Sequence, residues 1–510
     1  MGAGAALDAA SRGLTVGLVE QDDWASGTSS RSSRLAHGGL RYLEQREFGL
    51  VHEALTERGL LLEHLAPHLV RPVRFVFPLA TGWERPYVGA GVALYDVLAR
   101  FGARSGTLPG HRHLSRRAAL RLFPGLNPES LAGAITFFDA QIDDARHTLA
   151  TVRTAVSHGT HAVSRMQVTD LVRRGDGVVG VRAHDRCADT DVEIRARSVV
   201  FATGVWGPVG APSPASVAPS KGVHLVVPQS AVLAHTALIA RTGSSVLFCL
   251  PWEQHWLIGT TDTPWTGRLG VNEDDVEATD EDIDYLLGEA NRWLRRPLTR
   301  ADVVGVYAGL RPLVSDEPPS DTTRVSREHQ VSRLAPGLVS VAGGKYTTYR
   351  VMAADVIDAA VAELPAGRRP GPSRTEALPL VGAEDFATLW QERTLLGAEH
   401  GVPVGVVEHL LRRHGDQVVD VLGLVSADPE LGRAVAPGTV YLKAEVVHAA
   451  AVEGAMEVAD VMNRRTRLST EVADSARAHA RTVAELMAPV LGWSADALDE
   501  ATGSYLAPDR

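Results

Sequence analysis

The stretch GAGAALDAASRGLTVGLVEQDDWASGTSSRSSRLAHGGLRYLE, residues 2–44, decides the fold class. Glycines, an alanine-rich segment, a short apolar strand and an acidic residue form the later part of a dinucleotide-binding unit. Gly2 and Gly4 open a predicted helix, and residues 14–19 form a predicted strand that finishes at Glu20. A carboxylate at that position can accept hydrogen bonds from both ribose hydroxyls of an adenosine. The usual first strand of the unit does not precede Gly2 in this sequence.

The composition is that of an ordinary globular protein. A chain of 510 residues is expected to hold two or three domains, and its 45% hydrophobic and 22% charged residues include no apolar run near the roughly 20 residues of a membrane span. Cys187 and Cys249 form no disulfide or zinc framework, which favours a reducing, cytoplasmic compartment. The net charge of -10 argues against a nucleic-acid-binding protein but allows a local basic patch for phosphate or anionic lipid.

Helical and strand periodicities alternate over roughly the first 365 residues, which predicts an α/β architecture. Residues 49–66 keep apolar positions three and four apart and predict an amphipathic helix. Short apolar strands are expected at about 73–79, 178–183 and 197–202.

The sequence pattern changes at about residue 206 and again at about residue 365. Residues 206–222 are rich in proline and predict a long loop, whereas the alternating segments of 223–335 predict an antiparallel sheet. Residues 365–379 are the best linker candidate, and the chain beyond a boundary near residue 380 reads as helical.

We assign no metal from the sequence. The acidic run 272–287 lacks the central glycine and terminal glutamate of an EF-hand loop. Thr279 and Asp282 have the spacing of a capping box instead, so this run is expected to start a solvated helix. The neighbours His111 and His113 have no second pair of ligands nearby in sequence.

Residues 8–45 closely resemble the signature of the FAD-dependent glycerol-3-phosphate dehydrogenases, and later motifs repeat the match in the same order. The later motifs are SKGVHLVVP (220–228), IGTTD (258–262), AGLRPL (308–313), SREH (326–329), GGKYTTYR (343–350), YLKAEVVHAA (441–450) and RRTRL (464–468). Family members usually carry a strand and a glycine-rich turn before the position of Met1, so the chain is expected to be truncated at its N-terminus relative to the family.

The resemblance implies a Rossmann-like FAD-binding domain, an antiparallel-sheet substrate domain and an all-helical C-terminal domain. It divides the chain into an oxidoreductase region, a linker and the helical domain, at 1–365, 366–380 and 381–510. Within the first region, FAD-binding segments are expected at about 1–80, 140–222 and 336–365, interleaved with substrate-domain segments at about 81–139 and 223–335.

The expected FAD-binding residues supply a carboxylate, short hydroxyls, or glycine backbone that a ring or a pyrophosphate can approach closely. They are Gly2, Gly4, Glu20, Ser29, Ser30, Ser32, Ser33, His37, Gly38, Gly39, Leu40, Gly204, Gly343, Gly344 and Thr347. Arg31 or Arg34 is available to add positive charge to the serine loop, TSSRSS at residues 28–33.

The expected substrate pocket is cationic, because a small phosphate ester is held best by charge-assisted hydrogen bonds. The substrate-binding residues carried over from the family are Tyr42, Thr260, Thr261, Arg311, Arg327 and Lys345. His224, Arg311 and Lys345 are the expected catalytic residues. An imidazole can accept the substrate's hydroxyl proton near neutral pH, although a nearby cation could equally stabilise the forming alkoxide.

The implied reaction is oxidation of sn-glycerol 3-phosphate to dihydroxyacetone phosphate in glycerol catabolism. The family passes electrons to a membrane quinone, docks peripherally on the cytoplasmic face of the inner membrane, and is expected to form homodimers. One alternative is an oxygen-using glycerol-3-phosphate oxidase. Another is a flavin-free remnant with a binding role only, and a coding start placed too late would explain the same N-terminus more simply.

Overall fold

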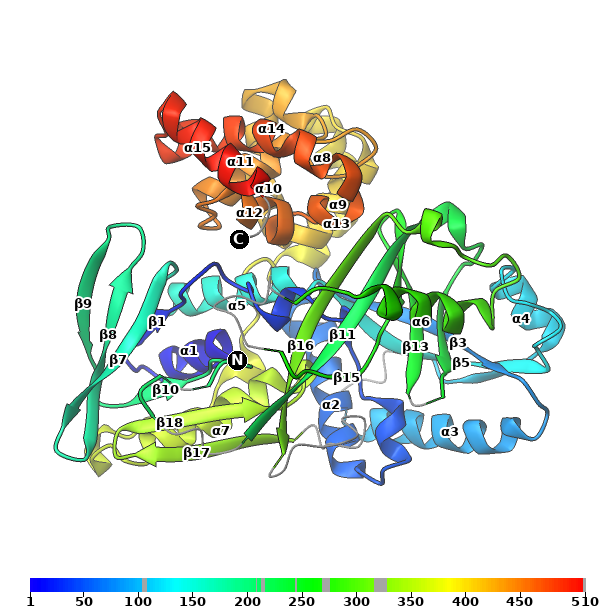
Figure 1. The fold of residues 1–510 in the computed structure, drawn as a ribbon, viewed down its shortest axis with the longest axis horizontal. Coiled ribbons are helices and arrows are strands. Elements are labelled where there is room, and N and C mark those ends of the chain that lie inside the picture. The colour runs from blue at the N-terminus through cyan, green and yellow to red at the C-terminus, as the bar shows by residue number, and fades with distance from the viewer. Residues whose placement is uncertain are drawn as a thin grey trace.

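The computed structural model describes residues 1–102, 108–207, 209–211, 216–243, 245–267, 276–315 and 328–507. Figure 1 shows a body of short strands and helices on the left, a broad sheet on the right, and a helical C-terminal domain above both. The left-hand body and the broad sheet meet near the N-terminus, where the candidate site lies.

The alanine-rich segment after Met1 forms α1 (Gly2–Ser11), as predicted. This helix packs between α5 (Asp144–Ser157) and α7 (Tyr349–Val361). Gly4 permits the close packing, because a Cβ there would lie 2.9 Å from the ring of Tyr349.

Two parallel strand pairs lie beside these helices and account for the α/β part of the fold. The strand β1 (Gly17–Val19) pairs with β6 (His161–Val163), and β10 (Val199–Phe201) pairs with β18 (Leu338–Gly343). The antiparallel strand β17 (His329–Ala335) extends the second pair. A separate three-stranded antiparallel sheet contains β7 (Met166–Arg174), β8 (Gly177–Asp185) and β9 (Thr190–Arg195).

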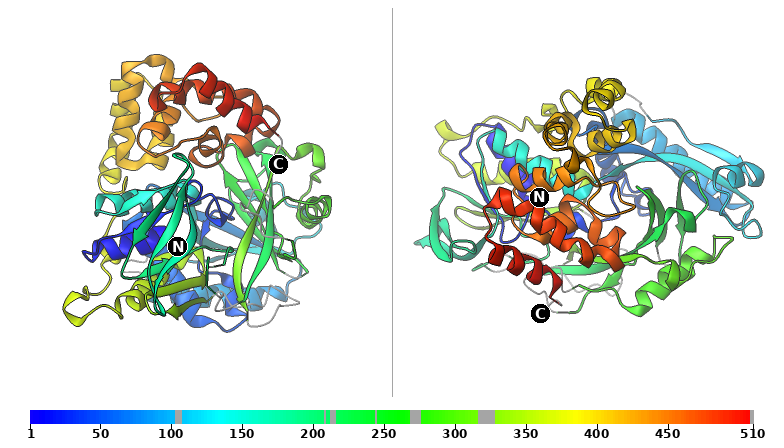
Figure 2. Two further views of the ribbon diagram at one scale, coloured as in Figure 1. Left: turned by 60° about the vertical axis from the view of Figure 1, so that its left-hand side comes forward. Right: turned by 90° about the horizontal axis from the view of Figure 1, so that it is seen from above.

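Within the described residues, the broad sheet has ten strands and is antiparallel except where β12 meets β3. Its main order is β15-β11-β14-β13-β12-β3-β5-β2, with β16 beside β11 and β4 beside β5. The strands are β2 (Leu35–Ala36), β3 (Val70–Leu79), β4 (Arg112–Ser115), β5 (Gly133–Ile142), β11 (Ser216–Pro228), β12 (Ala237–Arg241), β13 (Val246–Trp252), β14 (His255–Gly259), β15 (Thr263–Pro264) and β16 (Gly305–Ser315). Figure 2 shows the sheet from two further sides.

The prediction of a loop over residues 206–222 is wrong for its second part. Residues 216–222 belong to β11 and pair with β16 from Ser216↔Ser315 to Gly222↔Gly309. Proline has no backbone N–H to donate. Pro219 stands opposite Pro312, so neither residue leaves an unpaired N–H between the two strands. Long-range pairing therefore overrides the local proline signal.

Four helices flank the broad sheet and the first strands. They are α2 (Phe48–Leu60), α3 (Glu84–Gly102), α4 (Arg116–Leu122) and α6 (Asp280–Asn291). The helix predicted over 49–66 is α2, which continues into one π turn at Leu61–Leu65. The predicted capping box is present, since the Thr279 side chain accepts from the Asp282 amide and Asp282 reaches back to Thr279.

The C-terminal domain is helical, as predicted. Its helices are α8 (Phe386–His400), α9 (Val404–His414), α10 (Val418–Ala427), α11 (Lys443–Ala451), α12 (Val458–Asp460), α13 (Leu468–Glu471), α14 (Ala473–Leu491) and α15 (Ala495–Leu506). Between α7 and α8 the chain forms only the short 3-10 turns Ala366–Arg368 and Thr375–Ala377. The division of residues 1–365 into interleaved segments stays a prediction, and β3 joins the same sheet as β12.

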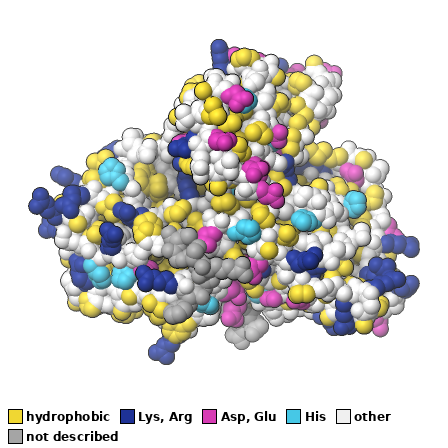
Figure 3. Space-filling model, turned by 180° about the vertical axis from the view of Figure 1, so that it is seen from behind, with side chains coloured by type: hydrophobic (Ala, Val, Ile, Leu, Met, Phe, Trp, Pro, Cys, Tyr) yellow, Lys and Arg dark blue, Asp and Glu magenta, His cyan; other side chains and the backbone are white. Residues whose placement is uncertain are grey.

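Apolar, basic and acidic side chains are interspersed over the face in Figure 3, and Lys and Arg side chains gather towards both ends of the lower body. None of the helices in the described residues is both long enough and apolar enough to cross a membrane.

Candidate active site

A cavity of about 2780 Å³ runs between α1, the parallel strand pairs and the broad sheet. Its volume exceeds that of a typical small-ligand pocket, as a dinucleotide together with a substrate requires. Most of the predicted FAD-binding residues line it: Gly2, Gly4, Glu20, Ser29, Ser32, Ser33, His37, Gly39, Leu40, Gly204, Gly343, Gly344 and Thr347.

Ser30 and Gly38 are not among the cavity-lining residues. The Ser30 hydroxyl donates to the Gly27 carbonyl, and the Ser30 carbonyl accepts from Arg467. A Cβ at Gly38 would lie 2.6 Å from both Leu55 and the Tyr95 hydroxyl, which itself accepts the Gly38 amide at 2.8 Å. Both residues contact the protein interior, next in sequence to the cavity-lining Ser29, His37 and Gly39.

Glu20 lines the cavity directly after β1. Burial raises the pKa of its carboxyl to about 7, partly offset by the hydrogen bond from the Asp22 amide. Two ribose hydroxyls donating to this carboxylate would favour its ionised form.

Gly343 and Gly344 form the turn between β18 and the helix that follows. Both have φ in the left-handed region, at 74° and 88°, which favours glycine. The turn leads into a 3-10 turn at Tyr346–Thr348 and then α7, so the cavity-lining Gly344 lies shortly before a helix N-terminus, a position suited to electron-rich oxygens. The Thr347 hydroxyl accepts a hydrogen bond from the His37 amide at 3.1 Å and donates one to the His37 carbonyl at 3.2 Å.

Lys345 is a buried cation of the cavity wall, and no residue that the structure describes hydrogen-bonds its Nζ. Burial lowers the pKa of this amine to about 8. Nζ lies 5.2 Å from the ring centroid of Tyr42, another predicted substrate residue. An unpaired buried ammonium group is costly, so this arrangement favours an anionic ligand.

Arg311 reaches the cavity from β16, in register with Ser220 of β11. Its guanidinium donates to the Thr260 hydroxyl at 2.8 Å and to the Thr261 carbonyl at 3.1 Å. Thr260 lines the cavity. The buried Thr261 hydroxyl instead accepts a hydrogen bond from the Val223 amide at 3.0 Å, within the broad sheet. Arg327 lies outside the described residues.

His224 is buried on β11 and lines the same cavity. Its Nε2 lies 2.8 Å from the Ser33 hydroxyl, and its ring stacks on Tyr307 with a centroid separation of 4.9 Å. Burial, followed by the charges of Arg311 and Arg34, lowers the pKa of His224 to about 3. The imidazole is therefore neutral at physiological pH and can accept a proton or a hydrogen bond.

Sequence reasoning missed Arg41 and Asp262 as site residues. Both line the cavity, and Asp262 lies between two arginines, 3.7 Å from Arg311 and 4.0 Å from Arg41. Arg41 also donates to Ser245 at 3.1 Å. Both residues stand within the motifs quoted for the resemblance, HGGLRYL and IGTTD, so their position was the available signal.

The two serine-loop arginines differ in placement. Arg31 lines the cavity and donates to the Ala308 carbonyl at 3.1 Å. Arg34 is buried away from the cavity, with its guanidinium 4.0 Å from the centroid of the Trp252 ring. Arg31 is thus the better placed source of charge.

Comparisons with known proteins agree with this geometry. Residues 1–359 match the family described as FAD dependent oxidoreductase, and residues 373–498 match the C-terminal domain of alpha-glycerophosphate oxidase. Glycerol-3-phosphate dehydrogenase 2 of Mycobacterium tuberculosis is 50% identical over 99% of this chain and 86% of that protein. The chain belongs to the FAD-dependent glycerol-3-phosphate dehydrogenase family.

More distant members also match nearly the whole chain. The human mitochondrial glycerol-3-phosphate dehydrogenase is 36% identical over 96% of this chain and 69% of its own length. The crystal structure of the Bacillus halodurans glycerol-3-phosphate dehydrogenase complexed with FAD is 29% identical, with a TM-score of 0.79 over 99% of this chain and 91% of that one.

FAD is the cofactor of this family, and the cavity residues fit it. Glu20 offers a carboxylate for ribose, and the left-handed glycines 343 and 344 leave backbone open to an electron-rich ring. Gly204, with φ of 62° and open space where a Cβ would stand, lines the cavity after β10.

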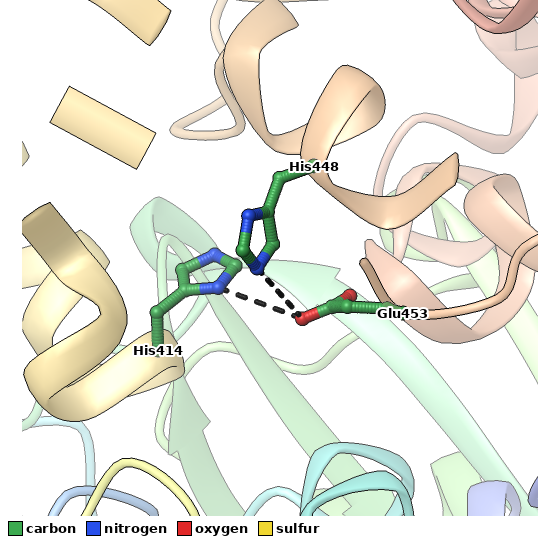
Figure 4. Close-up of side chains that lie close together, drawn as sticks. All are labelled: His414, His448 and Glu453. Atoms are coloured by element: carbon green, nitrogen blue, oxygen red, sulfur yellow. Dashed lines mark ion pairs between the residues drawn. The ribbon is translucent and has the colours of Figure 1, made fainter. Parts of the chain in front are cut away.

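Figure 4 shows His414, His448 and Glu453, which come close enough together to hold a metal ion. Arg146 already fills this position, donating to the two Glu453 oxygens at 2.5 and 3.0 Å and lying 3.1 Å from His414 Nδ1. A guanidinium at the carboxylate disfavours a further cation, so we interpret the cluster as part of a buried ion-pair network.

Proposed function

We propose that the protein oxidises sn-glycerol 3-phosphate to dihydroxyacetone phosphate and passes the electrons to a quinone, in glycerol catabolism. The observation that carries the proposal is the group of cations, Lys345, Arg311 and Arg41, lining the same cavity as His224. When bound, FAD accepts the hydride from C2 of the substrate.

The cations would bind the substrate phosphate. Arg311 and Arg41 present planar guanidinium groups, and Lys345 adds a point charge, with Arg41 and Lys345 each 5.2 Å from the centroid of the Tyr42 ring. Asp262 holds the two arginines near one another, which reduces the entropy lost when the phosphate is bound.

His224 would take the proton of the C2 hydroxyl. The Ser33 hydroxyl and the Tyr307 ring fix the orientation of its imidazole. The low pKa keeps the ring neutral, so it is ready to accept a proton but holds it weakly. Lys345 supplies the compensating charge beside the developing oxyanion.

A lipid-soluble acceptor suits the mouth of the cavity. Phe48, Tyr87 and Leu94 line the cavity while remaining 46%, 54% and 39% exposed. Large exposed apolar side chains at a cavity rim are typical of a surface that meets an apolar partner. These residues support a quinone over a small polar acceptor.

The same end of the molecule supports peripheral contact with the cytoplasmic face of the inner membrane. Trp83, directly before α3, and Val97, on α3, are also exposed, and Arg116, Arg117 and Arg121 are exposed on α4. A surface that exposes both apolar side chains and arginines suits an anionic lipid surface. Homodimerisation is a further proposal, based on the family alone.

Turnover with glycerol 3-phosphate tests the electron acceptor. The FAD-loaded protein is expected to reduce a soluble quinone analogue under anaerobic conditions and to release little peroxide in air. Peroxide equal to the substrate consumed would instead identify an oxidase. Colourless protein that cannot be reconstituted with FAD would support the flavin-free remnant.

A further inference from the structure

Three arginines of the C-terminal domain reach the cofactor-binding segment of the first domain. Arg464 and Arg465 stand in the π turn Val461–Arg465, and Arg467 precedes α13. Arg464 donates to the Asp23 carboxylate at 2.5 Å and Arg465 donates to it at 2.8 Å. Asp23 follows Glu20 by three residues. These ion pairs therefore join the C-terminal domain to a segment that lines the cavity.

Arg467 makes the contacts nearest the serine loop, residues 28–33. Its guanidinium donates to the Ser30 carbonyl at 3.1 Å, to Asp144 Oδ1 at 2.6 Å and to Asp143 Oδ1 at 3.1 Å. The Arg467 side chain is 3% exposed and the Asp144 side chain is fully buried. With the Asn463 carbonyl at 3.3 Å, one planar group donates to four acceptors, which a lysine ammonium could not reproduce in this geometry.

Asp144 connects Arg467 with the serine loop. Its second oxygen accepts from the Ser32 amide at 3.1 Å and from the Ser32 hydroxyl at 2.6 Å. The next residue, Ser33, holds His224, and the Ser32 carbonyl accepts from the Tyr307 hydroxyl at 3.0 Å. Arg467 therefore contacts Ser30 directly and reaches the cavity-lining Ser32 through Asp144.

Arg467 is part of a buried charge balance with the neighbouring carboxylates. Burial opposes ionisation of Asp143, but Arg467, Arg413 and Arg34 lower the pKa of this carboxyl to about 2. Removing one partner of a buried ion pair leaves the other charge uncompensated and is strongly destabilising. Without Arg467, Asp144 would lose the partner that holds it in place for Ser32.

We propose that Arg467 is a positioning residue for FAD, and that the C-terminal domain is a working part of the cofactor site. Through Asp144 and Ser32, Arg467 holds the serine loop in the conformation that meets the cofactor. The inference concerns retention of FAD and is independent of the electron acceptor.

The test compares Arg467→Lys with the matched control Glu453→Gln. Glu453 lies in the same buried network and is held by Arg146, but its side chain does not contact the serine loop. Hydrogen–deuterium exchange of residues 28–34 in the FAD-free full-length protein, the Kd for FAD and the Tm are measured for each variant.

Arg467→Lys is expected to speed exchange of residues 28–34 and to raise the Kd for FAD by about tenfold or more. Glu453→Gln is expected to lower the Tm while leaving loop exchange and the Kd close to wild type. A wild-type Kd and loop exchange in Arg467→Lys would overturn the proposal. An equal loss of FAD affinity in Glu453→Gln at the same fall in Tm would also overturn it.

The double variant Arg467→Gln/Asp144→Asn keeps the test decisive if Arg467→Lys does not fold. It removes both charges together and leaves no unpaired carboxylate at Asp144. The proposal expects this folded variant to bind FAD at least about tenfold more weakly, with faster loop exchange. FAD binding and loop exchange at wild-type levels in the double variant would contradict it.

Discussion

Lys345 is the most informative single residue of the site, because it is buried, faces the cavity and has a pKa lowered to about 8 by burial. If it binds phosphate, Lys345→Met should lower kcat/KM for glycerol 3-phosphate by about 10- to 100-fold, the value of a charged hydrogen bond. The protonated amine is lost as pH rises through 8, so the wild-type KM should increase above that pH. Lys345→Arg, which stays charged, should show a flatter KM profile, and a wild-type KM that is constant from pH 7 to 9 would contradict the role.

His224 offers a prediction that separates proton transfer from binding. His224→Gln should lower kcat by about 100-fold or more while changing KM much less, because a general base acts in the transition state. Ser33→Ala removes only the hydroxyl that orients Nε2 and should have a smaller effect. A large rise in KM with unchanged kcat in His224→Gln would assign this residue to substrate binding instead.

At the scale of elements, local signals predicted the individual helices α1, α2 and α6. The alanine-rich run of α1, the periodicity of α2 and the Thr279 capping box each depend on neighbouring residues, and each appears in the structure. The start of β11 at Ser216 could not be predicted, since it depends on pairing with β16 about ninety residues away. The same long-range packing decides which residues face the cavity. It turns Ser30, Gly38 and Thr261 towards the interior and places Asp262 between two arginines.

The turn at Gly39 gives a test at this scale. Gly39 has φ of 81°, and a Cβ there would lie 2.3 Å from the Tyr42 ring and 2.9 Å from Lys345 Nζ. Gly39→Ala should lower the free energy of unfolding by about 1 to 2 kcal/mol and raise KM for glycerol 3-phosphate. Gly49→Ala, at a helical position in α2 with open space around it, is the control and should be neutral or stabilising. A wild-type KM in Gly39→Ala would show that the turn does not set the substrate site.

Over the whole molecule, buried ionisable groups predict loss of stability in mild acid. Burial lowers the pKa of four histidines to about 3 or 4: His68, His147, His224 and His448. The stabilisation from these neutral rings is present above their ordinary pKa of 6.5 and is lost as pH falls from there towards 3.

Glu20 and Glu471 act in the opposite direction. Burial raises the pKa of each to about 7, so their contribution is present below 4.5 and is lost as pH rises to 7. Four histidines outweigh two glutamates between pH 4.5 and 6.5, so the Tm should fall as pH is lowered through that range. His68→Gln should reduce this pH dependence, and a Tm that rises from pH 6.5 to 5 would contradict the balance.

The central claim is that this chain binds FAD in the cavity and reduces it with glycerol 3-phosphate. Anaerobic mixing of the FAD-loaded, full-length protein with that substrate tests the claim most directly, with flavin absorbance as the readout. The flavin should bleach with sn-glycerol 3-phosphate and not with glycerol, because only the phosphate engages Lys345 and Arg311. Bound flavin that stays oxidised with glycerol 3-phosphate, or bleaches equally with glycerol, would contradict it.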